Sequence, residues 1–132
     1  MAGPRGARQQ RIGWGSNAGR ARARSADYGA DQLDAELEKA WQATVLEIAE
    51  TCGWQRRYHT YDSRRSTPGF PDLCLCRPPR LLFAEVKRED GRVSRDQWGW
   101  YDDLKRCGVE VYIWRPSDRD EVDRVLASRR RP

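Results

Sequence analysis

The sequence predicts a single α/β domain, in which a four-stranded mixed sheet is flanked by helices in the order α-β-β-β-α-β-α. Its 132 residues are enough for one ordinary domain and too few for two. An amphipathic helical repeat opens the domain, and apolar strand-like segments and further helical repeats follow it. Hydrophobic residues make up 38% of the chain and charged residues 34%, which is polar for a globular protein but not typical of disorder.

Residues 1–30 form a basic arm that we expect to be disordered, ahead of a folded domain over residues 31–132. The arm has six arginines and one acid, Asp27, so it carries the entire net charge of +5. It has too little apolar surface to offset the entropy of ordering. Such an arm suits a polyanion, because arginines that neutralise phosphates release counterions; a solubilising tail explains it equally well. We find no signal peptide or apolar membrane span and therefore expect a cytoplasmic protein.

A helix is predicted over residues 31–52, because apolar residues recur at the spacing of one helical face and Gly53 is suited to end it. The apolar positions are Leu33, Leu37, Trp41, Val45, Ile48 and Cys52. The next ten residues, WQRRYHTYDS, indicate a strand that runs into a turn, and RRSTPG (64–69) indicates a loop.

Two apolar strands follow on either side of Pro78-Pro79. Alternation places one set of side chains on each face of the pair. One face has Leu73, Leu75, Leu82, Ala84 and Val86, and the other has Cys74, Cys76, Leu81 and Phe83. Strands that are apolar on both faces lie at the centre of a sheet covered by helices on both sides.

The remainder of the chain predicts a helix, a strand and a final helix. The sequence SRDQ has the pattern of a capping box, with Ser94 as the N-cap and Gln97 at the reciprocal position, and the helix stops at Gly108. The segment VEVYIW (109–114) alternates strictly and indicates a strand. The last helix follows Pro116 and has apolar positions at Val122, Val125 and Leu126.

Asp72 and Glu85 are predicted to be direct neighbours across the two central strands. In a hairpin folded about Pro78-Pro79, residues pair when their numbers add up to 157, as these two do. Their Cβ atoms would then lie about 5 Å apart. Lys87, two residues after Glu85, shares their face. The prediction requires an antiparallel hairpin, since a slip of one residue would turn the two carboxylates to opposite faces.

This trio has a plain chemical interpretation. Two carboxylates in a partly desolvated position repel each other, so one keeps its proton unless a cation lies between them. A hard divalent ion such as Mg²⁺ or Mn²⁺ resolves this conflict, since it takes oxygen ligands. Lys87 is then placed to orient the attacking water or to stabilise charge on a phosphate, which suffices for phosphodiester hydrolysis. The alternative is an ion-paired cluster at a strand end.

The motifs PD (71–72) and EVK (85–87) resemble the P-D…(D/E)-x-K nuclease superfamily, whose restriction-endonuclease-like core has the order α-β-β-β-α-β. The longer pattern GFPDL…AEVKREDGRVSRDQWGWYDDLKRCGVEVYIWRP is similar to the VRR-NUC (virus-type replication-repair nuclease) domains. The likeness covers roughly residues 33–126. It implies an endonuclease that depends on Mg²⁺ or Mn²⁺ and acts on DNA, often on branched, flapped or four-way (Holliday) junction structures in DNA repair. It also implies a bacterial or phage origin.

The resemblance assigns roles to individual residues. It implies that Asp72 and Glu85 are metal ligands, that Val86 belongs with them, and that Lys87 is the catalytic lysine. Family members also have an acid on the first helix that approaches the metal. Glu38 lies about 60° from the centre of the apolar stripe, whereas Glu36, Glu47 and Glu50 lie more than about 110° away, so Glu38 is the candidate; a solvated helix residue is the alternative.

Further positions have open alternatives. The resemblance suggests that Gln97 lies beside the metal and acts in catalysis, whereas the capping box explains it structurally, and both can hold. The loop before the aspartate contains Arg64, Arg65 and Ser66. They are candidate phosphate contacts; the alternative is that the loop is simply solvated. His59 is interpreted as packing or as a hydrogen-bond partner. Trp41, Trp98 and Trp114 fall on faces expected in the core, so no aromatic residue is assigned to nucleic acid.

Three function classes follow. The first is the metal-dependent DNA endonuclease, the second is a nucleic-acid-binding module of the same fold without turnover, and the third is a structural protein with an ion-pair network. One small domain has one active site, so symmetric cutting of two strands requires a homodimer.

Overall fold

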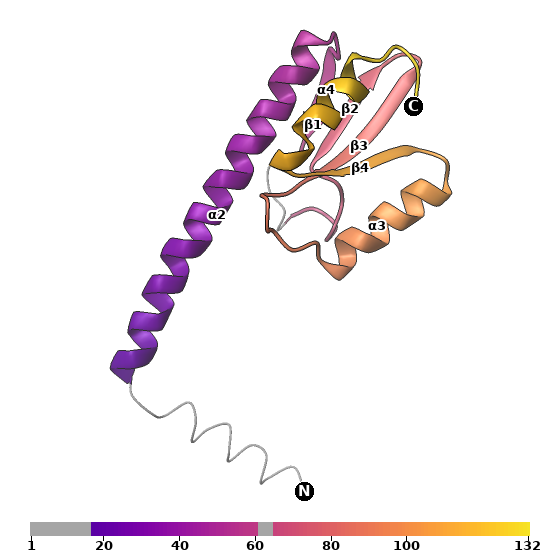
Figure 1. The fold of residues 1–132 in the computed structure, drawn as a ribbon. Helices are drawn as coiled ribbons and strands as arrows, with labels where there is room; N and C mark the ends of the chain where they lie inside the picture. Colours follow the sequence, from indigo (N-terminus) through magenta and orange to yellow (C-terminus); the bar gives the residue numbers. More distant parts are fainter. Residues whose placement is uncertain (1–16, 61–64) are drawn as a thin grey trace, which may run out of the picture. The chain divides into compact units, whose positions relative to one another are not determined.

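The computed structural model describes residues 17–60 and 65–132, with side chains from Gly29 onward, and confirms the predicted element order (Figure 1). A short 3-10 turn, η1, precedes the last helix. The elements are α2 (Asn17–Thr51), β1 (Arg56–His59), β2 (Leu73–Arg77), β3 (Arg80–Val86), α3 (Arg95–Arg106), β4 (Glu110–Trp114), η1 (Pro116–Asp118) and α4 (Arg119–Ala127).

Helix α2 begins at Asn17, so the predicted start at Asp31 was wrong. Alanine and arginine, which are frequent in residues 17–30, are strong helix formers and need no apolar stripe to continue a helix. The chain divides into two compact units, Met1–Leu33 and Asp34–Pro132, and the second contains the C-terminal part of α2 and all strands. Of the predicted arm, residues 1–16 lie outside the described residues.

The sheet is mixed, as predicted, with the strand order β1-β2-β3-β4. Strand β2 pairs antiparallel with both β1 and β3, whereas β4 pairs parallel with β3. In the β2–β3 hairpin Leu73 pairs with Ala84 and Arg77 pairs with Arg80 across Pro78-Pro79, which confirms the predicted register. Asp72 is thereby placed beside the end of β3.

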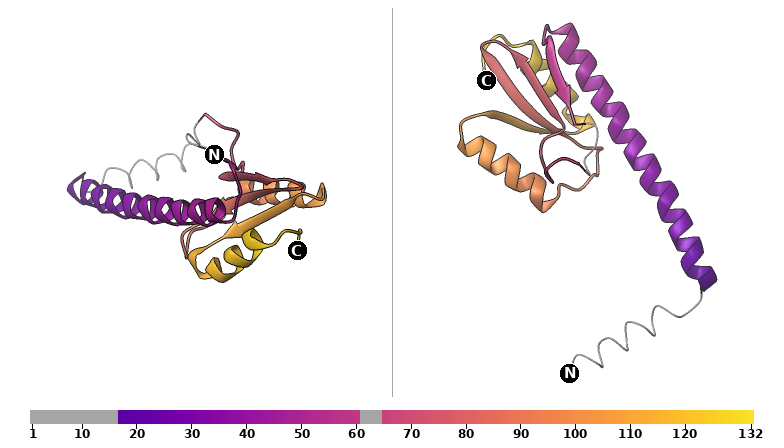
Figure 2. Two further views of the ribbon diagram at one scale, coloured as in Figure 1. Left: turned by 90° about the horizontal axis from the view of Figure 1, so that it is seen from above. Right: turned by 180° about the vertical axis from the view of Figure 1, so that it is seen from behind.

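One face of the sheet carries the hydrophobic core. Leu73, Leu75 and Leu82 are at most 1% exposed and pack beneath α4 and the C-terminal part of α2. Helix α4 lies in front of the strands in Figure 1 and behind them in the reversed view of Figure 2. Trp41 and Trp54 also belong to this core. Their buried ring N–H groups are satisfied, since they donate to the carbonyls of Trp114 (3.0 Å) and Leu126 (2.8 Å) respectively.

The other face is only partly covered, which corrects the expectation of burial on both sides. Phe70 packs edge-on against Phe83 and against Trp100 of α3, with ring centroids 5.9 and 5.0 Å apart. Helix α3 has no buried residue, and Leu81 and Trp98 are 44% and 47% exposed, so the placement of Trp98 in the core was wrong. The physical reason is that α3 contacts the sheet mainly beside β4, leaving the rest of this face open.

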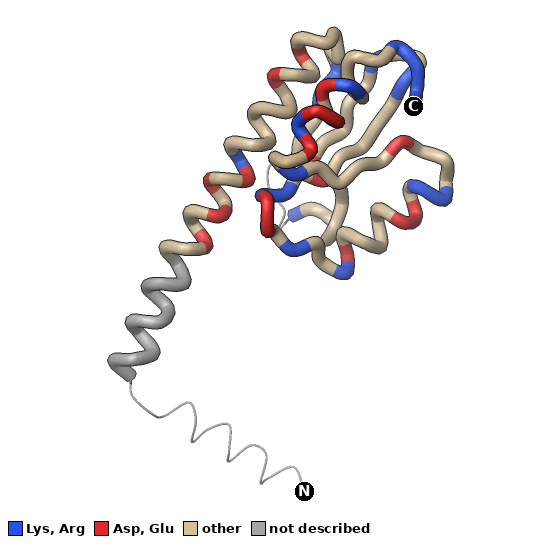
Figure 3. The backbone as a smooth tube through the Cα atoms, in the orientation of Figure 1, with Lys and Arg blue, Asp and Glu red and all other residues tan. Residues whose placement is uncertain are grey.

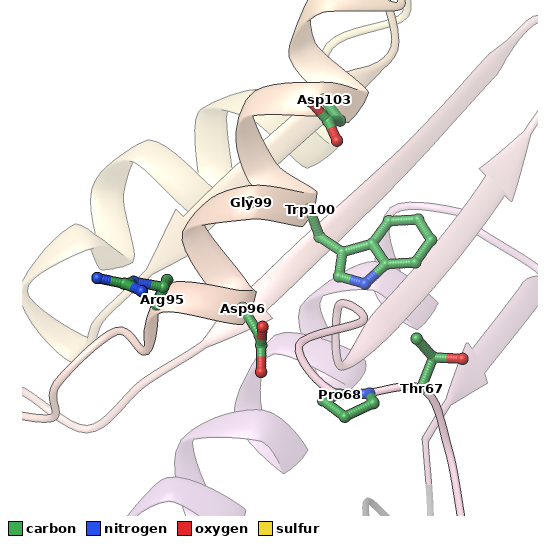
Figure 4. Close-up of a pocket in the computed structure, with 7 residues that line it drawn as sticks. All are labelled: Thr67, Pro68, Arg95, Asp96, Gly99, Trp100 and Asp103. Atoms are coloured by element: carbon green, nitrogen blue, oxygen red, sulfur yellow. The ribbon is translucent and has the colours of Figure 1, made fainter.

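The loop before Asp72 is fixed against the start of α3. Gly69 has a φ of +86°, and a Cβ at this position would overlap the backbone carbonyl of Asp96. Figure 4 shows Thr67 and Pro68 of this loop across from Asp96 and Trp100 of α3. Only glycine permits this close approach without strain, so Gly69 helps to position the Pro71-Asp72 pair.

Candidate active site

Ten residues line a hollow of about 560 Å³ where α2, the ends of β1–β3 and the start of α3 meet. We call it the site hollow. Its lining residues are Ala35, Glu38, Lys39, Gln42, His59, Thr60, Asp72, Glu85, Lys87 and Gln97. It therefore brings together all the predicted catalytic side chains and the predicted acid of the first helix.

Asp72 is held at the end of β2 by its neighbours. Its backbone carbonyl accepts a hydrogen bond from the Thr60 N–H at 3.0 Å, which continues the β1–β2 pairing. Its Oδ2 accepts a hydrogen bond from the Val86 N–H at 2.9 Å. The carboxylate is therefore directed at the end of β3, beside Glu85.

Glu85 is an ionisable group with almost no access to water, since it is 5% exposed. Burial, and then the nearby Asp72 carboxylate, raise its pKa to about 9, although Lys87 acts in the opposite direction. Its Oε1 accepts a hydrogen bond from Gln97 Nε2 at 2.9 Å. With both carboxyl groups ionised, its buried Oε2 has no hydrogen-bond partner in the described part of the chain, whereas a proton there would be shared with Asp72 and adds to the raised pKa. A proton or a cation next to Asp72 would satisfy this oxygen.

Gln97 takes part both in the N-terminal cap of α3 and in the candidate active site. Its Oε1 accepts from the Ser94 N–H (2.8 Å) and its own N–H donates to Ser94 Oγ (3.1 Å), which confirms the capping box. The side-chain amide nitrogen remains available for Glu85. The cap thus fixes the amide in the orientation that holds the Glu85 carboxylate.

Glu38 reaches the hollow from α2, as its angular position predicted. Its Oε1 lies 3.8 Å from Lys87 Nζ, and its side chain is 37% exposed. Burial raises its pKa, and Asp72 adds to this effect, whereas Lys87 lowers it. Lys87 itself is 13% exposed, and its charge lowers the pKa of both Glu38 and Glu85.

Within the described residues, no three His, Cys, Asp or Glu side chains come together as a ready-made metal site. Each carboxylate already has one partner: Val86 N–H for Asp72, Gln97 for Glu85 and Lys87 for Glu38. The unpartnered Oε2 of Glu85 beside Asp72 is nevertheless the kind of oxygen a hard divalent ion binds, and such ions keep several waters. The donor set therefore fits Mg²⁺ or Mn²⁺.

The remaining predicted residues are placed less directly. The Val86 side chain is fully buried in the core, so only its backbone can take part in metal binding. Arg64 lies outside the described residues. Arg65 is exposed and Ser66 is half-buried, and neither lines the site hollow.

Sequence reasoning missed five of the ten lining residues: Ala35, Lys39, Gln42, His59 and Thr60. Gln42 follows Glu38 by one helical turn, so the helical repeat contained the signal for it. His59 pairs with Leu73, the residue after Asp72, but this contact depends on the β1–β2 register, which the sequence did not specify.

The mixed sheet and the Asp-Glu-Lys cluster at its strand ends define an α/β protein with a restriction-endonuclease-like core. The family model of the VRR-NUC domain matches residues 28–118, which is more than half of the chain. The chain therefore belongs to the VRR-NUC domain family and has a nuclease-type function.

A relative supports this assignment over part of the chain. The Fanconi-associated nuclease 1 homolog of Schizosaccharomyces pombe (strain 972 / ATCC 24843) is 38% identical over 56 residues, which are 41% of this chain and 8% of that protein. It is a eukaryotic protein and so lends no support to the expected bacterial or phage origin. No solved structure matches the chain. None of the described helices is long and apolar enough to cross a membrane.

Proposed function

We propose that this chain is a DNA endonuclease that requires Mg²⁺ or Mn²⁺ and uses water as the nucleophile. Asp72 and Glu85 would hold the ion, with Glu38 and the Val86 carbonyl as further ligands. The observation that carries the proposal is the buried, unpartnered Oε2 of Glu85 next to a second carboxylate. Membership of the VRR-NUC family supports the same chemistry.

Individual residues of the chain would have separate roles in the reaction. When bound, the ion would act as a Lewis acid on the phosphate. Lys87 would stabilise the negative charge that develops on the scissile phosphate and orient the attacking water. Gln97 would hold the Glu85 carboxylate in a single orientation, and the Val86 N–H would do the same for Asp72.

Substrate selectivity is a further part of the proposal. The resemblance to nucleases of replication and repair favours branched, flapped or four-way junction DNA over linear duplex. The chain covers only 8% of the yeast relative's length, so that protein's activity as a whole gives no direct assignment here. A single site hollow would cut one strand, and symmetric cutting of two strands would use a homodimer.

A second candidate is a nucleic-acid-binding module without turnover. It is favoured by the ion pair between Lys87 and Glu38, which engages two of the groups that catalysis would use. The two candidates share the fold and differ in whether a phosphodiester bond is broken.

A cleavage panel separates them. Linear, flapped and four-way DNA would be incubated with the protein in EDTA, and then with Mg²⁺ or Mn²⁺ restored. Cleavage that appears only with the metal and is lost in Glu85→Gln supports the endonuclease. Metal-independent binding without cleavage of any substrate supports the binding module, and metal-independent cleavage contradicts both.

A further inference from the structure

A second hollow lies at the other end of β3 from the candidate active site. It measures about 420 Å³, and its walls include Arg129, Arg130 and Arg131 together with Leu81 and Glu110. We call it the arginine hollow. Figure 3 shows the arginine run as a blue segment next to the C-terminus. Arg80, at the start of β3, lines this hollow, whereas Glu85, near the end of β3, lines the site hollow.

The charge of the arginine hollow is positive and uncompensated. Its single acid, Glu110, forms a buried ion pair with Arg80 at 2.7 Å, so these two charges cancel. Arg129, Arg130 and Arg131 are exposed, and among the described residues none of them forms an ion pair. The three arginines are therefore exposed and form no ion pair within the part of the chain that the structure describes, although the charge of Arg131 also lowers the pKa of Glu110.

The arginine run is held in place at both ends. At its start, the Ser128 carbonyl accepts hydrogen bonds from Arg77 and, at 2.7 Å, from Arg80 Nη1. At its end, Arg131 Nη1 donates to the Gly108 carbonyl at 2.6 Å. The backbone at the start of the run is thus fixed to the β2–β3 hairpin, and the Arg131 side chain is held at the turn before β4. A fixed backbone loses less entropy when it binds a ligand than a free tail does.

We propose that Arg129, Arg130 and Arg131 bind the phosphate backbone of duplex DNA, as an anchor separate from the site that cuts. The inference rests on the proposed function for the identity of the polyanion. Guanidinium groups pair with phosphate oxygens through two parallel hydrogen bonds. A row of three such groups suits a repeated polyanion, and the release of counterions supplies the binding energy.

The position of the anchor sets the length of DNA that can use it. Arg80 and Glu85 are five residues apart on β3, which corresponds to about 17 Å at the usual rise of a strand. Duplex DNA rises about 3.4 Å per base pair, so the anchor contacts the duplex on the order of five base pairs from the cut. A shorter duplex arm on that side does not reach it.

The test compares two triple variants that remove equal charge. One is Arg129→Gln/Arg130→Gln/Arg131→Gln, and the control is Arg56→Gln/Arg92→Gln/Arg119→Gln, whose exposed arginines line neither hollow. Dissociation constants are measured in EDTA for a flapped DNA whose duplex arm grows from about two to about twelve base pairs. The same measurement over a range of salt concentrations gives the number of phosphates neutralised.

We expect the wild-type protein and the control to gain affinity once the arm passes about five base pairs, and the arginine-run variant to show no gain. The slope of log Kd against log salt should fall by about 2.7 in that variant, for three lost phosphate contacts. An equal loss in both triple variants, or a gain with arm length that survives in the arginine-run variant, would overturn the proposal.

Two further results keep the test decisive. If the triple variant does not fold, Arg129→Gln/Arg130→Gln replaces it, since Arg130 bonds to Ser128 through its backbone and the Arg131 side-chain bond remains. Because binding is measured without metal, an arginine effect without any cleavage supports the anchor and refutes the nuclease. Cleavage without an arginine effect does the reverse.

Discussion

Asp72 and Glu85 face each other at the ends of two paired antiparallel strands, and the Asp72 carboxylate accepts the N–H of Val86, the residue after Glu85. This contact brings a second negative charge to a carboxyl group that is already buried. Without a cation, a proton on Glu85 removes the repulsion between the two carboxylates. Burial and this repulsion together raise the pKa of Glu85. The relationship connects the stability of the fold to the chemistry of the site.

The first prediction concerns pH. The pKa of Glu85 is raised from 4.5 in the unfolded chain to about 9 in the folded protein, so the folded state binds this proton more tightly. Its stabilising contribution is complete below pH 4.5 and is lost as the pH rises towards 9. In EDTA, the free energy of unfolding should fall by up to about 1.4 kcal/mol per pH unit from this group.

Glu85→Gln should remove most of that slope, because a neutral amide keeps the shape but does not titrate. Urea unfolding at several pH values between 5 and 9 (about one unit apart) measures the difference between the two proteins. Glu36→Gln, on the exposed face of α2, is the control and should keep the wild-type slope. Equal slopes in wild type and Glu85→Gln would contradict the raised pKa.

The second prediction concerns metal binding. Mn²⁺ at about 100 times its Kd should raise the free energy of unfolding by about 2.7 kcal/mol, because it binds the folded state alone. At one fixed Mn²⁺ concentration the effect should be larger at about pH 8 than at about pH 6, since the ion competes with the proton on Glu85. Asp72→Asn should abolish it, and EDTA should reverse it. Titration calorimetry that shows equal Mn²⁺ binding to wild type and Asp72→Asn would refute the ligand assignment.

The third prediction concerns the lysine. Lys87→Ala should lower kcat by about 100-fold or more, because it removes the charge that stabilises the transition state. Its pair with Glu38 is partly exposed and long, so stability should change by less than about 1 kcal/mol. Single-turnover cleavage and binding in EDTA separate the two effects. Arg119→Ala, which breaks an exposed ion pair on α4, is the matched control and should cleave normally.

The fourth prediction compares two glycines. Gly69→Ala should destabilise the fold by roughly 2 kcal/mol or more, because φ is +86° and the new Cβ overlaps the Asp96 backbone. Gly99→Ala places its Cβ in open space within α3 and should stabilise the protein by up to about 1 kcal/mol. Thermal unfolding tests both. A neutral Gly69→Ala would show that the loop before Asp72 is not fixed by this close approach.

Local rules were sufficient for several features of the site. The two-residue turn at Pro78-Pro79 and the length of its flanking strands determined the register, and the register placed Asp72 beside Glu85. The capping pattern of Ser94 and Gln97 located the start of α3, and helical geometry selected Glu38. Each of these depends on hydrogen bonds or angles within a few residues, which sequence spacing encodes.

Only the tertiary structure decided the rest. The second role of Gln97 as a partner of Glu85, the entry of His59 into the site hollow and the exposure of Trp98 all depend on how separate elements meet. The arginine run is fixed by carbonyl contacts to β2, β3 and the turn before β4, which no spacing along the chain predicts. The physical reason is that strand register and helix caps follow from short-range bonding. By contrast, which faces are buried and which charges meet follows from packing between residues distant in sequence.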